Sequence, residues 1–203
     1  MKPIARYALV FAGNVVAAVY LHELGHAVAG WMQGIAVVPS PAKEYVLRPQ
    51  VYWNQEIWIA LGGVAGTVLA AVGALAYFLR ARSLDAEAVL FGALIPPWVY
   101  TTRFLLLGRG HDGTEWQAAQ AALGLPPASH AVDVFFLCLS LAGIIVWAGR
   151  MRTPLHRRLP RMVGAALGGI ILLVALQVAN NRLFDRYFVP AQVVGAPSGL
   201  DAR

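Results

Sequence analysis

The sequence predicts an all-α polytopic membrane protein of about five transmembrane helices, with a short β-hairpin after the first helix. Of its 203 residues, 59% are hydrophobic and only 13% are charged, and the mean hydropathy is +0.61. A soluble domain of this length needs far more charge to cover its surface. The apolar residues also fall into separate runs, and a run of roughly 20 residues is long enough to cross a bilayer as a helix.

The apolar runs give five expected spans, at about 7–32, 56–79, 86–107, 131–149 and 162–180. The second span contains Gly62, Gly63 and Gly66, so we expect a neighbouring helix to approach its backbone closely. The third span is interrupted by Pro96–Pro97, which removes two backbone donors and should kink or break the helix. The single cysteine, Cys138, lies inside an apolar run and cannot form an internal disulfide.

The connection at residues 34–55 predicts the hairpin. It contains three prolines and two β-prone stretches, Tyr45–Leu47 and Val51–Trp53. Tyrosine and tryptophan are favoured at the membrane–water interface, so we expect the hairpin to lie there.

The connection at residues 108–130 predicts a short helix. Thr114 and Gln117 have the spacing of a capping box, which would start a helix at about Glu115 and extend it to Leu123. Gly124, followed by two prolines, would end it.

The distribution of arginines predicts the topology. Arginine is densest in the loop at 150–161, which the positive-inside rule places in the cytoplasm together with the N-terminus. By parity, the end of the first span and the loop after the third span share the opposite side. The basic residues that give the net charge of +6 lie between apolar runs, so this charge indicates contact with a lipid bilayer and not with nucleic acid. Much Ala, Gly and Arg with little Lys favours a bacterium with GC-rich DNA. We therefore expect an integral protein of the bacterial cytoplasmic (inner) membrane.

We expect the first span to stay attached to the protein. It has the basic start and apolar run of a signal peptide, but no small-residue cleavage site follows. Cleavage near Ala29 would also remove the most distinctive residues of the chain.

Those residues form an H-E-x-x-H motif, made of His22, Glu23 and His26. Histidines four residues apart lie on one face of a helix, so both imidazoles can bind one Zn²⁺. Glu23 can then act as general base toward water at the metal, as in other zinc peptidases with this motif. Ionisable groups at membrane depth are costly and are therefore functional candidates. The alternatives are polar contacts between helices or metal binding without catalysis.

A catalytic zinc site has three protein ligands and an open position, so a third ligand is needed. The candidates on the correct side of the membrane are His111, Asp112 and Glu115. We favour Asp112, because Gly113 lets the backbone bend closely past the motif helix; its alternative role is that of a turn residue. His111 competes because imidazole is also a good zinc ligand. Glu115 is less favoured because it is expected in the first turn of a helix, where the helix dipole already stabilises a carboxylate.

Over roughly residues 10–120 the chain resembles the site-2-protease-type family of intramembrane zinc metalloproteases. The resemblance rests on HELGHAVAG in the first apolar helix, LGGVAGT in the second span and an Asp–Gly near a span end. It implies His22, His26 and Asp112 as metal ligands and Glu23 as the base. The family Asp usually follows Asn–Pro or Leu, whereas here it follows Gly110–His111. The resemblance also implies a hairpin to which an extended substrate can add by strand pairing.

We therefore expect a zinc-dependent intramembrane endopeptidase that cleaves a membrane-anchored peptide or protein. It should form a single membrane-embedded domain over 1–203, with a metal-site core at about 10–125, additional spans at about 131–180 and a C-terminal tail at 181–203. One alternative is a membrane zinc hydrolase of a non-peptide substrate. Another is a non-catalytic metal-binding scaffold, against which the intact Glu23 argues.

Overall fold

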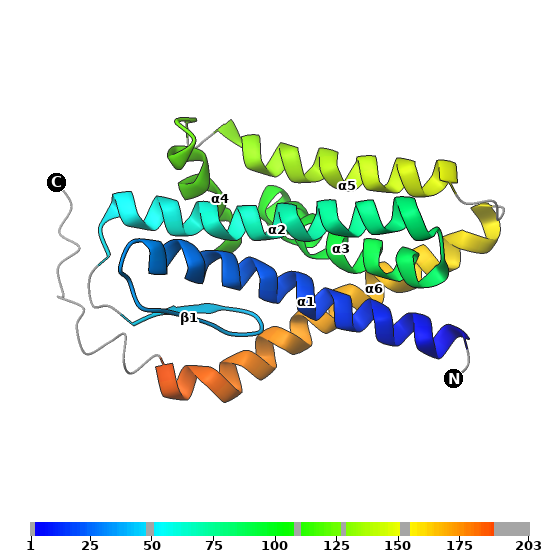
Figure 1. Cartoon of the computed structure of the whole chain (residues 1–203), viewed down its shortest axis with the longest axis horizontal. Helices are drawn as coiled ribbons and strands as arrows, with labels where there is room; N and C mark the ends of the chain where they lie inside the picture. Colours follow the sequence, from blue (N-terminus) through cyan, green and yellow to red (C-terminus); the bar gives the residue numbers. More distant parts are fainter. Residues whose placement is uncertain (1–2, 48–50, 108–110, 127–128, 151–154, 189–203) are drawn as a thin grey trace.

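The structure is a computed structural model that describes residues 3–47, 51–107, 111–126, 129–150 and 155–188, without the side chains of 111–114 and 155–158. The elements follow in the order α1 (Pro3–Met32), β1 (Val37–Pro39), β2 (Glu44–Val46), α2 (Trp53–Ala81), α3 (Leu84–Leu107), α4 (His111–Ala122), α5 (Ala131–Arg150), α6 (Leu155–Asn180) and the π-helical turn η2 (Asn181–Asp185) (Figure 1). Among the described residues, five helices are long and apolar enough to cross a membrane: α1, α2, α3, α5 and Leu159–Phe188. The predicted all-α polytopic fold is confirmed.

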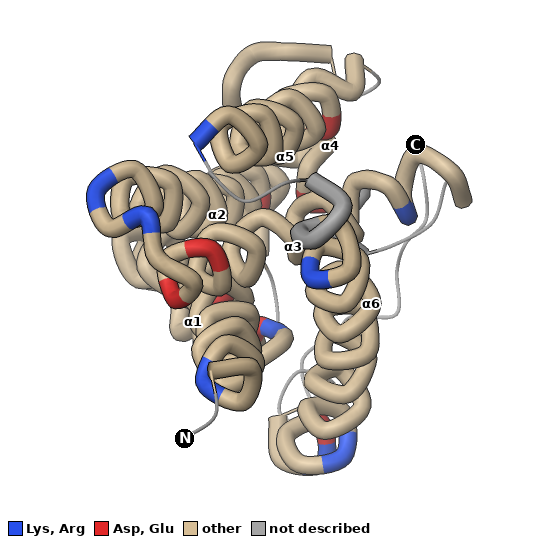
Figure 2. The backbone as a smooth tube through the Cα atoms, turned by 90° about the vertical axis from the view of Figure 1, so that its right-hand side faces the viewer, with Lys and Arg blue, Asp and Glu red and all other residues tan. Residues whose placement is uncertain are grey.

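The helices run back and forth between two ends of a bundle. The end of α1, the start of α2, α4 and the hairpin gather at one end (Figure 1). The start of α1, the end of α2 and the end of α5 gather at the other, where Figure 2 shows basic residues on several helices. The end of the first span and the segment after the third span therefore share one side, as parity predicts.

Helices α1 and α2 form what we call the seam, in which their backbones touch. A Cβ atom added to Gly25 would collide with the carbonyl group of Gly62, and one added to Gly66 would collide with the carbonyl oxygen of Leu21. Only glycine permits this spacing, so the close approach predicted for the second span is confirmed.

The hairpin exists, but one of its predicted strands is wrong. Strand β2 contains the predicted Tyr45 and pairs antiparallel with β1, with Val37 opposite Val46. Val51–Trp53 is not a strand, because Trp53 begins α2. The side chain of Gln55 accepts a hydrogen bond from the Tyr52 backbone N–H at 3.2 Å and so caps the new helix.

Two further boundaries differ from expectation. Helix α3 is unbroken through Pro96–Pro97, both buried among neighbouring helices. Helix α4 begins at His111, so Thr114 lies inside the helix and is not its N-cap. Local turn preferences are weak and tertiary packing overrides them: α4 packs against α2 through the buried Trp116. The predicted end is confirmed, since Gly124 adopts φ +70° just after the helix.

The last span is longer than predicted. The expected tail began at residue 181, but helical backbone continues through η2 to Phe188. The polar residues of this segment predict a tail when only the sequence is considered, because the hairpin residues that they contact are distant in sequence. The side chain of Asn180 is buried against Ser40, 140 positions away.

Candidate metal centre

The three motif side chains lie in the interior of the bundle. His22, Glu23 and His26 are 8%, 6% and 1% exposed. The two imidazole rings meet edge to face, with ring centroids 4.5 Å apart. Their Nε2 atoms are 3.0 Å apart. The convergence expected from the four-residue spacing is therefore present in the structure.

Helix α2 fixes the orientation of both rings. The Nδ1 atom of His22 lies 2.9 Å from the Gly63 carbonyl oxygen and 2.9 Å from the Thr67 hydroxyl. The Nδ1 atom of His26 lies 2.8 Å from the Ile59 carbonyl oxygen. A carbonyl oxygen only accepts, so each Nδ1 carries a hydrogen and donates it. When the imidazole is neutral this is its only N–H hydrogen, and each Nε2 then presents a lone pair. Contacts of this kind orient metal-ligating histidines in proteins.

Helix α4 brings a carboxylate to the same point. The Oε2 atom of Glu115 lies 3.3 Å from Nε2 of His22 and 3.5 Å from Nε2 of His26. In a tetrahedral zinc site with bonds of about 2.0–2.1 Å, neighbouring ligand atoms are about 3.3 Å apart. Together with the 3.0 Å between the two nitrogens, the three separations fit one small cation. Two imidazoles and one carboxylate are also a typical donor set for catalytic zinc.

The structure thus brings Glu115, the less favoured sequence candidate, to the histidines. The side chains of His111 and Asp112 lie outside the described residues, so Asp112 as third ligand stays a prediction. A sequence signal for Glu115 exists, because Ala118 and Ala119 follow it by three and four positions and are 4% and 0% exposed. Residues at these spacings share a helix face. An apolar stripe after Glu115 therefore indicates that its side chain faces inward.

A second carboxylate, missed in the sequence, approaches from the hairpin. Ligand atoms of Glu23, His26 and Glu44 lie within 4.8 Å of one another. This group shares His26 with the first one. Because Nδ1 of His26 is occupied by the Ile59 carbonyl, His26 has one nitrogen left and can bind only one metal. The described residues could therefore hold one metal ion here, with an additional acid beside it. No motif marks Glu44 in the sequence.

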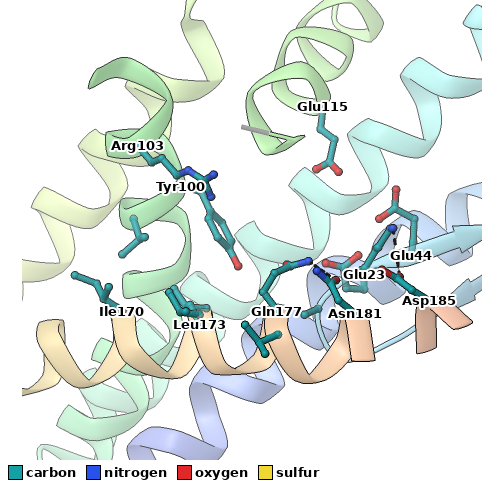
Figure 3. A pocket seen from close by; sticks show the side chains of 15 residues that line it. Glu23, Glu44, Tyr100, Arg103, Glu115, Ile170, Leu173, Gln177, Asn181 and Asp185 are labelled. Carbon is teal, nitrogen blue, oxygen red and sulfur yellow. Dashed lines mark hydrogen bonds and ion pairs between the residues drawn. The ribbon is translucent and has the colours of Figure 1, made fainter. Parts of the chain in front are cut away.

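A cavity of about 730 Å³ opens onto this centre (Figure 3). Glu23, Glu44 and Glu115 lie at its wall, with Arg103 and Tyr100 of α3. One face of α6 forms much of the apolar side, through residues Ile170, Leu173, Val174 and Val178. An apolar wall thus leads to an acidic, metal-competent end.

Polar contacts that we call the latch join the hairpin to the end of α6. Asn180 accepts a hydrogen bond from Ser40 at 2.6 Å and donates one to the Tyr45 hydroxyl at 2.9 Å. Tyr45 donates to Asp185 at 2.7 Å, and Lys43 lies 3.5 Å from the same carboxylate. Burial, and then the hydrogen bond to Asp185, raises the pKa of the Tyr45 hydroxyl, so it remains a donor at physiological pH.

Comparison of the chain with protein-family models, with curated proteins and with solved structures finds no match. The functional argument therefore rests on the residues and their geometry.

Proposed function

We propose that this protein is a zinc-dependent intramembrane endopeptidase of the site-2-protease type that cleaves a membrane-anchored peptide or protein. His22, His26 and Glu115 hold the metal, and Glu23 is the general base. The observation that carries the proposal is the convergence of two imidazole lone pairs and one carboxylate oxygen within 3.0–3.5 Å.

A bound cation would account for such a convergence. Two lone pairs and an anionic oxygen repel one another, and burial away from water makes the repulsion stronger. A single proton can satisfy only one of the three contacts, whereas a divalent ion satisfies all of them. When bound, zinc supplies a Lewis acid for a carbonyl group and lowers the pKa of water.

Glu23 is placed to move protons. Glu23 and Glu115 are far apart in the sequence, but the carboxylates of both line the same cavity. The three converging atoms belong to His22, His26 and Glu115, and the Glu23 carboxylate is not among them. In the proposed role it takes a proton from the attacking water and passes it to the leaving amine, which is the usual task of a general base in peptide hydrolysis.

The cavity suits a membrane-anchored chain. The wall that α6 contributes is apolar. In the span Leu159–Phe188, only 17% of the most apolar 18-residue window is buried inside the protein. A helical substrate already has its backbone hydrogen bonds satisfied, so the segment that is cut must unwind to reach Glu23. Polar side chains that line the cavity, among them the exposed Gln177 and Asn181, offer hydrogen bonds to an unwound backbone.

The variant Glu23→Gln tests the proposal, with Glu56→Gln, an exposed carboxylate in the first turn of α2, as the matched control. We expect purified wild type, Glu23→Gln and Glu56→Gln each to hold about one zinc per chain by elemental analysis. Cleavage of membrane-anchored peptides should fall by about 10²–10⁴-fold in Glu23→Gln, since that is the usual contribution of a general base. Zinc-free wild type, or a fully active Glu23→Gln, would contradict the proposal.

A further inference from the structure

Glu44 is a carboxylate held in a fixed position at the wall of the cavity. It lies on β2 opposite Pro39 of β1. The turn that precedes it is closed by Ser40, whose backbone N–H donates to the Lys43 carbonyl at 2.9 Å. The next residue, Tyr45, is fully buried in the latch. Adjacent strand residues point to opposite faces, so anchoring Tyr45 turns Glu44 toward the cavity.

Glu44 is near the metal centre but is not one of its ligands. Its carboxylate lies within 4.8 Å of the ligand atoms of His26 and Glu23. Within the described part of the chain it forms no ion pair with either histidine at 4.0 Å or less, whereas Glu115 lies at 3.3 and 3.5 Å. Neighbouring ligands of one tetrahedral zinc would be about 3.3 Å apart. Glu44 therefore lies outside the ligand positions of the proposed metal site, beside Glu23, the proposed base.

No basic side chain of the described residues forms an ion pair with Glu44. Among the described residues, Asp185 pairs with Lys43, and Glu115 faces the two histidines. Glu44 makes none of the ion pairs found in this part of the chain, and it lies beside another carboxylate. Two like charges in a partly buried site are unfavourable, and a cation that enters between them is bound favourably.

We propose that Glu44 is a specificity-determining residue that binds a lysine or arginine side chain of the substrate, within about two residues of the scissile bond. The inference rests on the proposed peptidase function. An extended chain advances about 3.3 Å per residue, so a basic side chain one or two residues from a bond at Glu23 can reach Glu44. A charge-assisted hydrogen bond between the two groups is roughly twice as strong as a neutral one.

Arg103 gives this recognition a direction. It lines the same cavity, and Figure 3 shows its guanidinium and the Glu44 carboxylate on opposite sides of Glu115. A basic substrate residue is repelled on the Arg103 side and attracted on the Glu44 side. The favoured basic residue therefore lies on one side of the cut bond only.

A binding experiment separates this proposal from the question of activity. The protein carries Glu23→Gln throughout, so that peptide is bound but not cut, and is reconstituted with zinc. The probes are synthetic peptides with one apolar segment followed by a window that contains a single lysine, or glutamine at the same position, with the lysine moved along the window. We expect at least one lysine peptide to bind about tenfold more tightly than its glutamine counterpart. Adding Glu44→Gln should abolish the difference, and adding Glu44→Lys should reverse it toward a glutamate peptide.

Equal binding of all lysine and glutamine peptides overturns the proposal, as does a lysine preference that survives Glu44→Gln. Loss of zinc in Glu44→Gln also overturns it, because Glu44 would then be a ligand. Adding Glu56→Gln instead serves as control and should leave the preference unchanged. If the preference is present but a protein with Glu23 intact cuts none of these peptides, the recognition role stands and the peptidase function fails.

Discussion

The seam between α1 and α2 and the interface between the hairpin and α6 are built on different principles. At the seam, glycines bring two backbones into contact and leave no room for a methyl group. At the latch, single polar side chains such as Asn180 and Tyr45 join elements beside a cavity of about 730 Å³. The histidines belong to the first region, and the apolar cavity wall belongs to the second.

In the proposed function, this difference separates metal binding from substrate access. Backbone contacts cannot adjust without moving a whole helix, so the seam holds the imidazoles in one geometry. Side-chain hydrogen bonds contribute only about 0.5–1.5 kcal/mol each, so the latch can open at modest cost. The other end of α6 is held separately, through Arg161, which lies 3.6 Å from the fully buried Glu87. Opening the latch therefore frees one end of α6 without releasing the helix.

Gly63→Ala should have the largest effect, because it breaks the seam at the metal. A Cβ atom at this position would collide with the ring of His26 and approach the ring of His22. We expect the variant to retain no zinc by elemental analysis. The matched control is Gly73→Ala in the same helix, where an added Cβ meets nothing within 4 Å. That variant should keep its zinc and lose no stability, because alanine is favoured over glycine in a helix by about 0.5–1 kcal/mol. Full zinc occupancy in Gly63→Ala would show that the seam is not rigid.

Glu115→Ala tests the third ligand. Loss of a group that merely orients a ligand lowers metal affinity about 10–100-fold, so loss of a ligand should lower zinc affinity by about 100-fold or more. Zinc affinities of His111→Ala, Asp112→Ala and Glu115→Ala should be measured by competition with a chelator. Near wild-type affinity in Glu115→Ala together with a large loss in Asp112→Ala would restore the assignment made from the sequence.

The sequence predicts what depends on neighbours along the chain. The spans, the glycine contacts and the histidine pair follow from hydropathy or from spacing within one helix. The strand at Val37 and the start of α4 at His111 depend instead on which segments pack together. Local propensity at Asp–Gly favours a turn, and packing of the Trp116 face overrides it.

The site follows the same division. His22, Glu23 and His26 come from one helical turn and can be recognised without any structure. Glu44 and Glu115 come from a hairpin and a short helix, and no spacing rule relates them to the motif. Their approach is decided by tertiary contacts across 18 or more positions of sequence, so it is the fold that brings them to the motif.

Thr67→Val should have an intermediate effect, confined to the seam. The Thr67 hydroxyl lies 2.9 Å from Nδ1 of His22, which also contacts the Gly63 carbonyl. Valine has nearly the same shape but cannot form this contact, and the carbonyl remains to hold the ring. We therefore expect zinc affinity to fall about tenfold, at the lower end of the range for orienting groups. Thr101→Val, at another buried threonine, is the control and should leave zinc affinity unchanged. A loss as large as that of Glu115→Ala would mean that the carbonyl contact alone cannot orient His22.

Tyr45→Phe should have the smallest effect on the metal and act on the latch alone. The change removes the hydroxyl that accepts from Asn180 and donates to Asp185, while the buried ring remains. Leaving these partners unpaired destabilises the latch by about 1–3 kcal/mol. Zinc affinity should stay within about twofold of wild type, because the Tyr45 hydroxyl bonds to Asn180 and Asp185 and not to any of the three proposed ligands.

Opening of the latch can be measured at Leu173, which lines the cavity but is only 7% exposed. In a background with Cys138→Ala, a thiol introduced by Leu173→Cys should react with a maleimide several-fold faster when Tyr45→Phe is added, since about 1.4 kcal/mol corresponds to a tenfold change in an opening equilibrium. Tyr187→Phe, at an exposed tyrosine near the same end of the chain, is the matched control and should leave the rate unchanged. Equal labelling in all three proteins would mean that packing along α6, and not the latch, keeps the cavity closed, and the contrast with the seam would then not hold.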